Sequence, residues 1–146
     1  MKLPPKEKIL EAYSAIADKR LQMIDDHHGE CTSSDGSKTY HIAWDQDTYA
    51  SDDNATYWQG YPGYPVLAVL LEQGRLTMNK DLIEDMKDIP WKKLNDQFKR
   101  DYSKAAAYAM KDLSRKEEIQ KMADQNNREL SDLNLTIKRK LKIQQA

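Results

Sequence analysis

The spacing of apolar residues changes near residue 28, and this change constrains the fold more than any other feature of the sequence. Before it, apolar residues recur every three or four positions, as on one face of an amphipathic helix. These residues are Ile9, Tyr13, Ile16, Ala17, Leu21 and Ile24. From Lys38 to Trp44, large apolar residues alternate with other residues instead, which is typical of a strand. The sequence therefore predicts a helix from Pro5 to Asp26, followed by β-structure.

A β-hairpin is predicted around the dipeptide Asp35-Gly36. This turn-forming pair lies between the segments Gly29–Thr32 and Lys38–Trp44, and such an arrangement is a strong hairpin signal. A third short strand near Thr48–Ala50 would extend the hairpin to an antiparallel three-stranded meander. The chain holds only two valines, so we expect any sheet to be small.

The C-terminal half is predicted to be helical. The run from Val66 to Leu71 is apolar on every side, which indicates a buried helix, and Pro65 suits its first turn. We predict a single α+β domain over residues 1–113, with a mostly α protein as the alternative. Its expected core residues are Ile9, Tyr13, Ile16, Ile42, Trp44, Leu67, Val69, Leu70, Leu71, Leu82, Trp91, Leu94 and Phe98.

Residues 114–146 are predicted to form a long last helix. Near-heptad spacing is kept by Ile119, Met122, Leu130, Leu133, Ile137 and Leu141, with Asn126 in the seam. A helix unbroken from Arg115 to Ile143 would be about 43 Å long. That exceeds the diameter of a domain whose radius of gyration is about 15 Å. The helix therefore packs on the domain, overhangs it, bends at residues 125–127, or mediates self-association through residues 115–143, where Asn126 would fix the register.

Composition excludes several classes of protein. A single cysteine, Cys31, rules out an intramolecular disulfide framework and a zinc site of paired cysteines. No apolar run approaches the length of about 20 residues that a bilayer requires, so no membrane partner is expected. The N-terminal segment lacks the apolar core of a signal peptide, which predicts a cytoplasmic location. With an isoelectric point near 6.3 and no recognisable nucleic-acid motif, nucleic acid is not an expected partner either.

One acidic and histidine-rich stretch is a candidate metal site. Asp26, His27 and His28 are adjacent at the end of the predicted first helix, and His41 on the neighbouring strand offers a more distant nitrogen. Neighbouring residues at a helix end seldom converge on one ion, so an exposed polar end is the simpler interpretation. The alternative function built on this pattern is a metal-dependent or small-molecule-processing enzyme using the segment 25–53.

An aromatic loop is the most informative functional feature. Tyr57, Trp58, Tyr61 and Tyr64 lie within eight residues beside Gly60, Pro62, Gly63 and Pro65. Aromatic rings on a loop can stack on a nucleobase, a sugar or another flat ligand, or can fasten the loop to the core. We predict a ligand pocket lined by these four rings and rimmed by Asp52 and Asp53.

No enzyme motif is recognisable in the sequence. The histidines belong to no triad or nucleophile elbow, and Gly60 and Gly63 match neither phosphate-binding fingerprint. We therefore expect a non-enzymatic module that binds a protein or a small molecule, and no cofactor is predicted.

Overall fold

The computed structural model describes residues 1–141 and shows an α+β fold, which confirms the predicted class. The helices are α1 (Glu7–Ala17), the π-helix η1 (Ala55–Gln59), α2 (Tyr64–Glu72), α3 (Lys80–Glu84), α4 (Trp91–Gln97), α5 (Tyr102–Met110) and α6 (Lys116–Asp132). The strands are β1 (Leu21–Met23), β2 (His28–Thr32), β3 (Thr39–Asp45), β4 (Thr48–Ser51) and β5 (Thr136–Lys138).

The sheet has five strands in the order β1-β2-β3-β4-β5. The predicted hairpin is β2 and β3, with Glu30 opposite His41 in the register and Gly36 in a left-handed conformation (φ 76°) in the turn. The predicted third strand is β4, antiparallel to β3. The predicted meander is therefore present, and two strands that the sequence analysis missed, β1 and β5, extend it at its edges.

The first helix is shorter than predicted. It ends at Ala17, because Lys19 adopts a left-handed conformation (φ 57°) and the N–H of Arg20 donates to the carbonyl of Ala15 at 2.9 Å. These contacts satisfy the last carbonyls of the helix, an ending that is usually encoded by glycine. The prediction of a helix to Asp26 was wrong because Leu21, although it keeps the helical spacing, lies in strand β1.

The last helix is also shorter than predicted. α6 runs without a break through residues 125–127 but ends at Asp132. The chain then extends at Leu133 (ψ 118°) and forms β5, which pairs parallel with β4. Leu133, Leu135 and Ile137 alternate as in a strand, and this short alternation was concealed within the heptad-like spacing. The predicted helix end at residues 142–143 lies outside the described residues.

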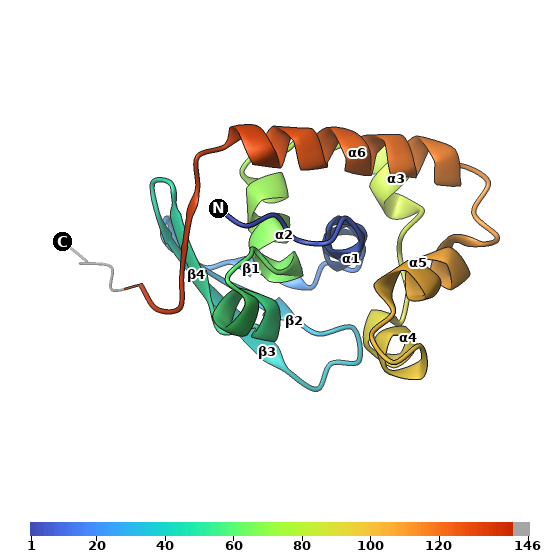
Figure 1. Ribbon diagram of the computed structural model, residues 1–146, viewed down its shortest axis with the longest axis horizontal. Helices are drawn as coiled ribbons and strands as arrows, with labels where there is room; N and C mark the ends of the chain where they lie inside the picture. The colour runs from blue at the N-terminus through green and yellow to red at the C-terminus, as the bar shows by residue number, and fades with distance from the viewer. Residues whose placement is uncertain (142–146) are drawn as a thin grey trace.

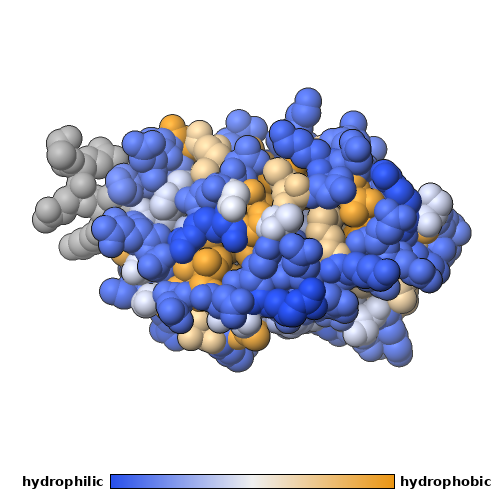
Figure 2. All heavy atoms as spheres, turned by 90° about the horizontal axis from the view of Figure 1, so that it is seen from above, coloured by the Kyte–Doolittle hydropathy of each residue, from blue (hydrophilic) through white to orange (hydrophobic). Residues whose placement is uncertain are grey.

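Helix α1 lies at the centre of the molecule and packs against α2, α3, α5 and α6, while α2 contacts the sheet (Figure 1). Of the thirteen predicted core residues, eleven are buried, and Ile16 and Phe98 pack against the core partly buried. α6 crosses above α1 and buries Ile119 and Leu130 in the same core. The face that carries α6 is mostly hydrophilic, with small apolar areas (Figure 2). The apolar side of α6 is thus used within its own chain.

Among the described helices, none combines the length and the apolar character needed to cross a membrane.

Candidate functional site

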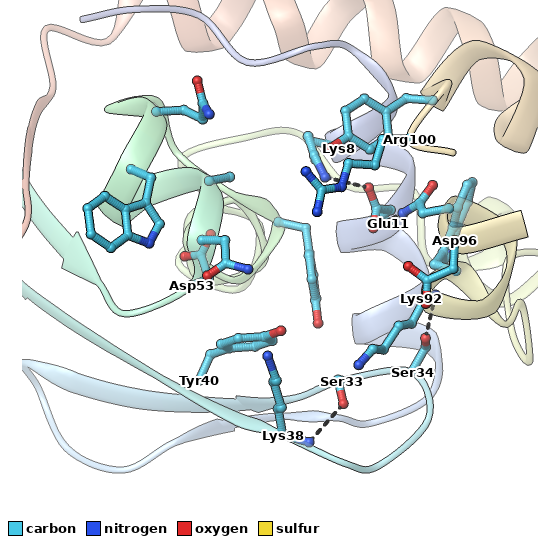
Figure 3. A pocket seen from close by; sticks show the side chains of 18 of the residues that line it. Lys8, Glu11, Ser33, Ser34, Lys38, Tyr40, Asp53, Lys92, Asp96 and Arg100 are labelled. Atoms are coloured by element: carbon cyan, nitrogen blue, oxygen red, sulfur yellow. Dashed lines mark hydrogen bonds and ion pairs between the residues drawn. The ribbon is translucent and has the colours of Figure 1, made fainter. Parts of the chain in front are cut away.

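A cleft of about 640 Å³ opens between α1, the β2–β3 turn, η1 and α4 (Figure 3). Its lining combines charged and aromatic side chains from segments far apart in the sequence. The charged residues are Lys8, Glu11, Arg20, Lys38, Asp53, Lys92, Asp96 and Arg100. The aromatic residues are Tyr40, Trp58, Tyr61, Tyr64, Trp91 and Tyr102.

A buried ion pair on α1 forms one part of the cleft lining. Lys8 and Glu11 lie one turn apart, with Lys8 Nζ 3.2 Å from Glu11 Oε2 and the side chains only 10% and 6% exposed. Burial raises the pKa of Glu11, against the opposing effect of the Lys8 ammonium. Burial alone would lower the pKa of Lys8, but the charge of Glu11, its hydrogen bond and the nearby Tyr102 and Tyr61 together outweigh burial, and the pKa is raised. The ammonium also lies 4.1 Å from the ring centroid of Tyr102, a cation–π contact.

Helix α4 is fixed against α1 by hydrogen bonds on the same side of the cleft. Asn95 Nδ2 donates to Glu11 Oε1 at 3.2 Å, and Trp91 Nε1 donates to Ser14 Oγ at 2.8 Å. The backbone N–H of Lys92 donates to Ser34 Oγ at 2.9 Å, which ties α4 to the β2–β3 turn. These bonds set the position of the cationic residues that α4 carries.

Asp53 stands on the opposite side, just before η1. Its Oδ2 accepts the N–H of Thr56 at 3.1 Å, and burial raises the pKa of its carboxyl group. Its other oxygen, Oδ1, is buried and has no hydrogen-bond partner within residues 1–141. π-Helical turns are rare and recur at functional sites, and η1 supplies this wall of the cleft.

Gly63 is required by the position of the Asp53 carboxylate. A β-carbon on Gly63 would overlap Asp53 Oδ2 and lie 2.8 Å from its Cγ. We expect Gly63→Ala to displace Asp53 and to lower the free energy of unfolding by about 1–3 kcal/mol. Urea denaturation of the variant tests this, with Gly29→Ala as a less crowded control, where the nearest atom would be 3.3 Å away. An unchanged midpoint for Gly63→Ala would contradict the close contact.

Arg100 is held at the cleft by an unusual backbone. Lys99 and Arg100 both have a positive φ, 52° and 64°. Their N–H groups donate to the carbonyls of Asp96 at 3.1 Å and Asn95 at 2.8 Å, which ends α4. Left-handed residues other than glycine are costly and cluster at functional sites. Arg100 lines the cleft in this conformation.

The structure brings together part of the predicted ligand site. Trp58, Tyr61, Tyr64 and Asp53 all line the cleft. Tyr57 does not line it but packs edge-on against Trp58, with 4.7 Å between ring centroids. Asp52 also lies outside, where its carboxylate accepts the N–H of His41 at 2.7 Å and pairs with His41 Nδ1 at 2.9 Å.

The four candidate metal ligands Asp26, His27, His28 and His41 are not brought together. His27 Nδ1 lies 3.0 Å from the carbonyl of Trp44, and His28 Nδ1 pairs with Asp25 at 2.8 Å. His41, on strand β3, pairs instead with Asp52, which directly follows β4. In the part of the chain that the structure describes, no group of three or more His, Cys, Asp or Glu residues could hold a metal ion.

Sequence reasoning missed most of the charged lining. Lys8 and Glu11 lie among buried residues of α1, and their spacing of three was the only signal that they could pair. Nothing local indicates that Lys38 meets Lys92 and Arg100, because the first lies before β3 and the other two lie on α4 and at its end. Only the tertiary fold brings them to the aromatic loop.

Comparison with known proteins assigns the chain to a family. A family model described as "Uncharacterised conserved protein UCP014422" matches residues 1–136. The chain belongs to this family. The match spans every cleft residue, from Lys8 to Tyr102. No curated protein and no solved structure matches the chain. The description of the UCP014422 family states no activity, and the cleft is the feature of the structure that indicates a function.

The buried carboxyl group of Asp53 makes the stability of the protein depend on pH. Its pKa is raised from 3.8, so the folded protein binds a proton more tightly than the unfolded chain does. The group therefore costs stability above its folded pKa, and the cost disappears as the pH falls towards 3.8. We expect Asp53→Asn to raise the free energy of unfolding by on the order of 1 kcal/mol at pH 7.5 and to have little effect near pH 4. Urea titrations at both pH values test this. A variant whose free energy of unfolding falls equally at both pH values would contradict it.

Proposed function

We propose that this chain is a non-enzymatic binding protein whose cleft takes a small anionic molecule. The observation that carries the proposal is the charge of the lining, which has five cationic side chains against three carboxylates. Lys38 and Arg100 have no carboxylate within ion-pair distance among residues 1–141. Lys92 has only the distant Asp35, at 3.7 Å.

The size and rigidity of the cleft support the same proposal. Small-molecule sites commonly enclose about 300–1,000 Å³, and this cleft lies inside that range. The hydrogen bonds of Trp91, Asn95 and Asp53 hold its walls in place. A site that is already formed loses less entropy when it binds a ligand.

Binding of inorganic pyrophosphate tests the proposal. We expect pyrophosphate to raise the melting temperature of the protein in proportion to the logarithm of its concentration, because it binds only the folded state. Arg100→Gln should weaken binding about 10- to 150-fold, the effect of losing one hydrogen bond to a charged group. Isothermal titration calorimetry gives the dissociation constants directly.

Lys99→Gln is the matched control for Arg100→Gln. Lys99 has the same charge and the same left-handed backbone but does not line the cleft. Equal losses in the two variants would mean that pyrophosphate responds to overall charge, and the cleft would then not be the binding site.

Two further predictions from the sequence belong with this proposal. A cytoplasmic location remains a prediction, and so does self-association through residues 115–143. Light scattering in line with size-exclusion chromatography on the full chain tests the second. If the chain is monomeric, the cleft is the remaining candidate for its function.

A further inference from the structure

Three residues that line the cleft each carry a buried acceptor atom without a hydrogen bond. These atoms are Glu11 Oε2, Asp53 Oδ1 and Asn95 Oδ1, and within the described residues only one other buried side-chain atom, on Asn127, shares this condition. Lys8 Nζ lies 3.2 Å from Glu11 Oε2, so the ion pair satisfies that oxygen, and Asp53 Oδ1 and Asn95 Oδ1 are left without a partner among residues 1–141. Buried polar groups in native proteins are nearly always partnered, so their concentration in one cleft has to be explained. A ligand that fits here must bring hydrogen-bond donors as well as negative charge.

Asp53 is the acceptor whose surroundings are best defined. The side chain is buried, its Oδ2 is engaged by Thr56, and the carboxylate occupies the space where a β-carbon on Gly63 would lie. Oδ1 is therefore the oxygen of this carboxylate that lacks a partner among residues 1–141. A carboxylate oxygen held in this way selects for an N–H or O–H group placed at one position.

Trp58 provides a flat surface on the same side of the cleft. Its side chain is 65% exposed although it lines the cleft, an unusual exposure for so large an apolar group. Tyr57 contacts its edge, and the guanidinium of Arg139 lies 5.7 Å from its ring centroid. Neither of these two residues lines the cleft; the guanidinium lies over one face of the indole, and the side chain of Trp58 remains mostly exposed.

The cationic groups lie across the cleft from Asp53. Figure 3 shows Arg100 and Lys92 on the α4 side, with Lys38 below and Asp53 on the far wall. One side of the cleft thus offers an indole ring and a hydrogen-bond acceptor, and the other carries the cations Arg100 and Lys92 together with the carboxylates of Glu11 and Asp96. A ligand that satisfies both sides is a flat, donor-bearing ring connected to an anion.

We propose that the ligand is a nucleoside monophosphate, with its base stacked on Trp58, an amino group of the base donating to Asp53 Oδ1, and its phosphate between Arg100 and Lys92. The inference rests on the proposed anion binding and specifies its ligand. A base, a ribose and a phosphate together suit a cleft of about 640 Å³, of which inorganic phosphate would occupy a small part. Bases stack on aromatic side chains regardless of their identity, and the acceptor on Asp53 favours those that carry an amino group.

Calorimetric titrations with AMP, ribose 5-phosphate, adenosine and pyrophosphate test the proposal on the full chain. We expect AMP to bind at least tenfold more tightly than ribose 5-phosphate and adenosine. Trp58→Ala should weaken AMP binding about 5- to 150-fold, the measured range for losing one stacked base. It should leave the dissociation constant of ribose 5-phosphate unchanged, as should Asp53→Asn, whereas Arg100→Gln should weaken both phosphate compounds.

Tyr108→Ala is the control for Trp58→Ala, because Tyr108 is an exposed aromatic residue on α5 that does not line the cleft. If ribose 5-phosphate binds as tightly as AMP and still depends on Arg100, the nucleotide assignment is overturned while the anion-binding function stands. If adenosine binds as tightly as AMP, or if none of the phosphate compounds binds, both proposals fail.

Discussion

Replacement of Glu11 by leucine is expected to lower the free energy of unfolding by about 3–5 kcal/mol. The carboxylate is the only acidic partner that the buried Lys8 ammonium has in residues 1–141, at 3.2 Å, and it also accepts a hydrogen bond from Asn95. Removing one member of a buried ion pair leaves an uncompensated charge in a medium of low polarity, and this accounts for the size of the effect. Urea denaturation monitored by circular dichroism measures it.

The double variant Lys8→Met with Glu11→Leu separates the pair from the general cost of altering the cleft. Two apolar side chains of similar volume often replace a buried ion pair without loss of stability. We therefore expect the double variant to be more stable than Glu11→Leu alone, and to recover most of the lost free energy. A double variant as unstable as the sum of the two single changes would show that the ion pair does not determine the stability of this wall.

Under the binding function proposed above, the charged pair in α1 serves the cleft as well as the fold. An apolar pair would suit the core of α1 equally well, since its neighbours Ile9 and Ala12 are fully buried. The pair instead keeps a cation and an acceptor atom at the cleft, beside the side chains of Asn95 and Tyr102. At positions 8 and 11, an apolar pair would suit the stability of the fold, whereas a charged pair suits the proposed binding in the cleft.

The sequence predicted the centre of the sheet and the core because these depend on local signals. Alternation from Tyr40 to Trp44 and the turn at Gly36 were sufficient for β2 and β3, and the apolar run after Pro65 was sufficient for α2. The edge strands were missed because each is three residues long. β1 follows a left-handed Lys19, and β5 is defined by its pairing with β4 rather than by its own composition.

The candidate site was predicted on one side only. Trp58, Tyr61, Tyr64 and Asp53 are close in sequence, so their composition could indicate a pocket. The opposite wall comes from α1, the β2–β3 turn and the end of α4, and no periodicity relates these segments to the aromatic loop. Arg100 depends on a left-handed backbone that arginine seldom adopts, so propensity argues against its position.

Replacement of Asn126 by leucine is expected to lower the free energy of unfolding by about 2–4 kcal/mol and to leave the molecular mass in solution unchanged. Asn126 is fully buried and joins three parts of the chain. Its Oδ1 accepts the hydroxyl of Tyr13, and its Nδ2 donates to the carbonyl of Thr77 and to Glu129 Oε1, both at 2.8 Å. Leucine would leave the Tyr13 hydroxyl and the Thr77 carbonyl without these partners in the core, at about 1–3 kcal/mol for each unsatisfied group.

Gln125→Leu is the matched control for this change. Gln125 is the neighbouring amide on α6, but its side chain is exposed, so we expect its replacement to alter stability by no more than about 0.5 kcal/mol. Tyr13→Phe combined with Asn126→Leu should cost less than the sum of the two single changes, because the hydroxyl that would lack a partner is gone.

The same variant separates the two roles that Asn126 can have. A polar residue in a helix seam fixes the register of paired chains, and its replacement by leucine then raises stability and changes the oligomer. The network from α6 to Tyr13 on α1 instead makes Asn126 a link within one chain, whose loss destabilises a protein of unchanged mass. Light scattering and urea denaturation on the wild type and on Asn126→Leu give opposite results in the two cases. A more stable variant with a different mass would mean that α6 pairs between chains in solution, and that the network from Tyr13 to Glu129 does not hold the helix in place.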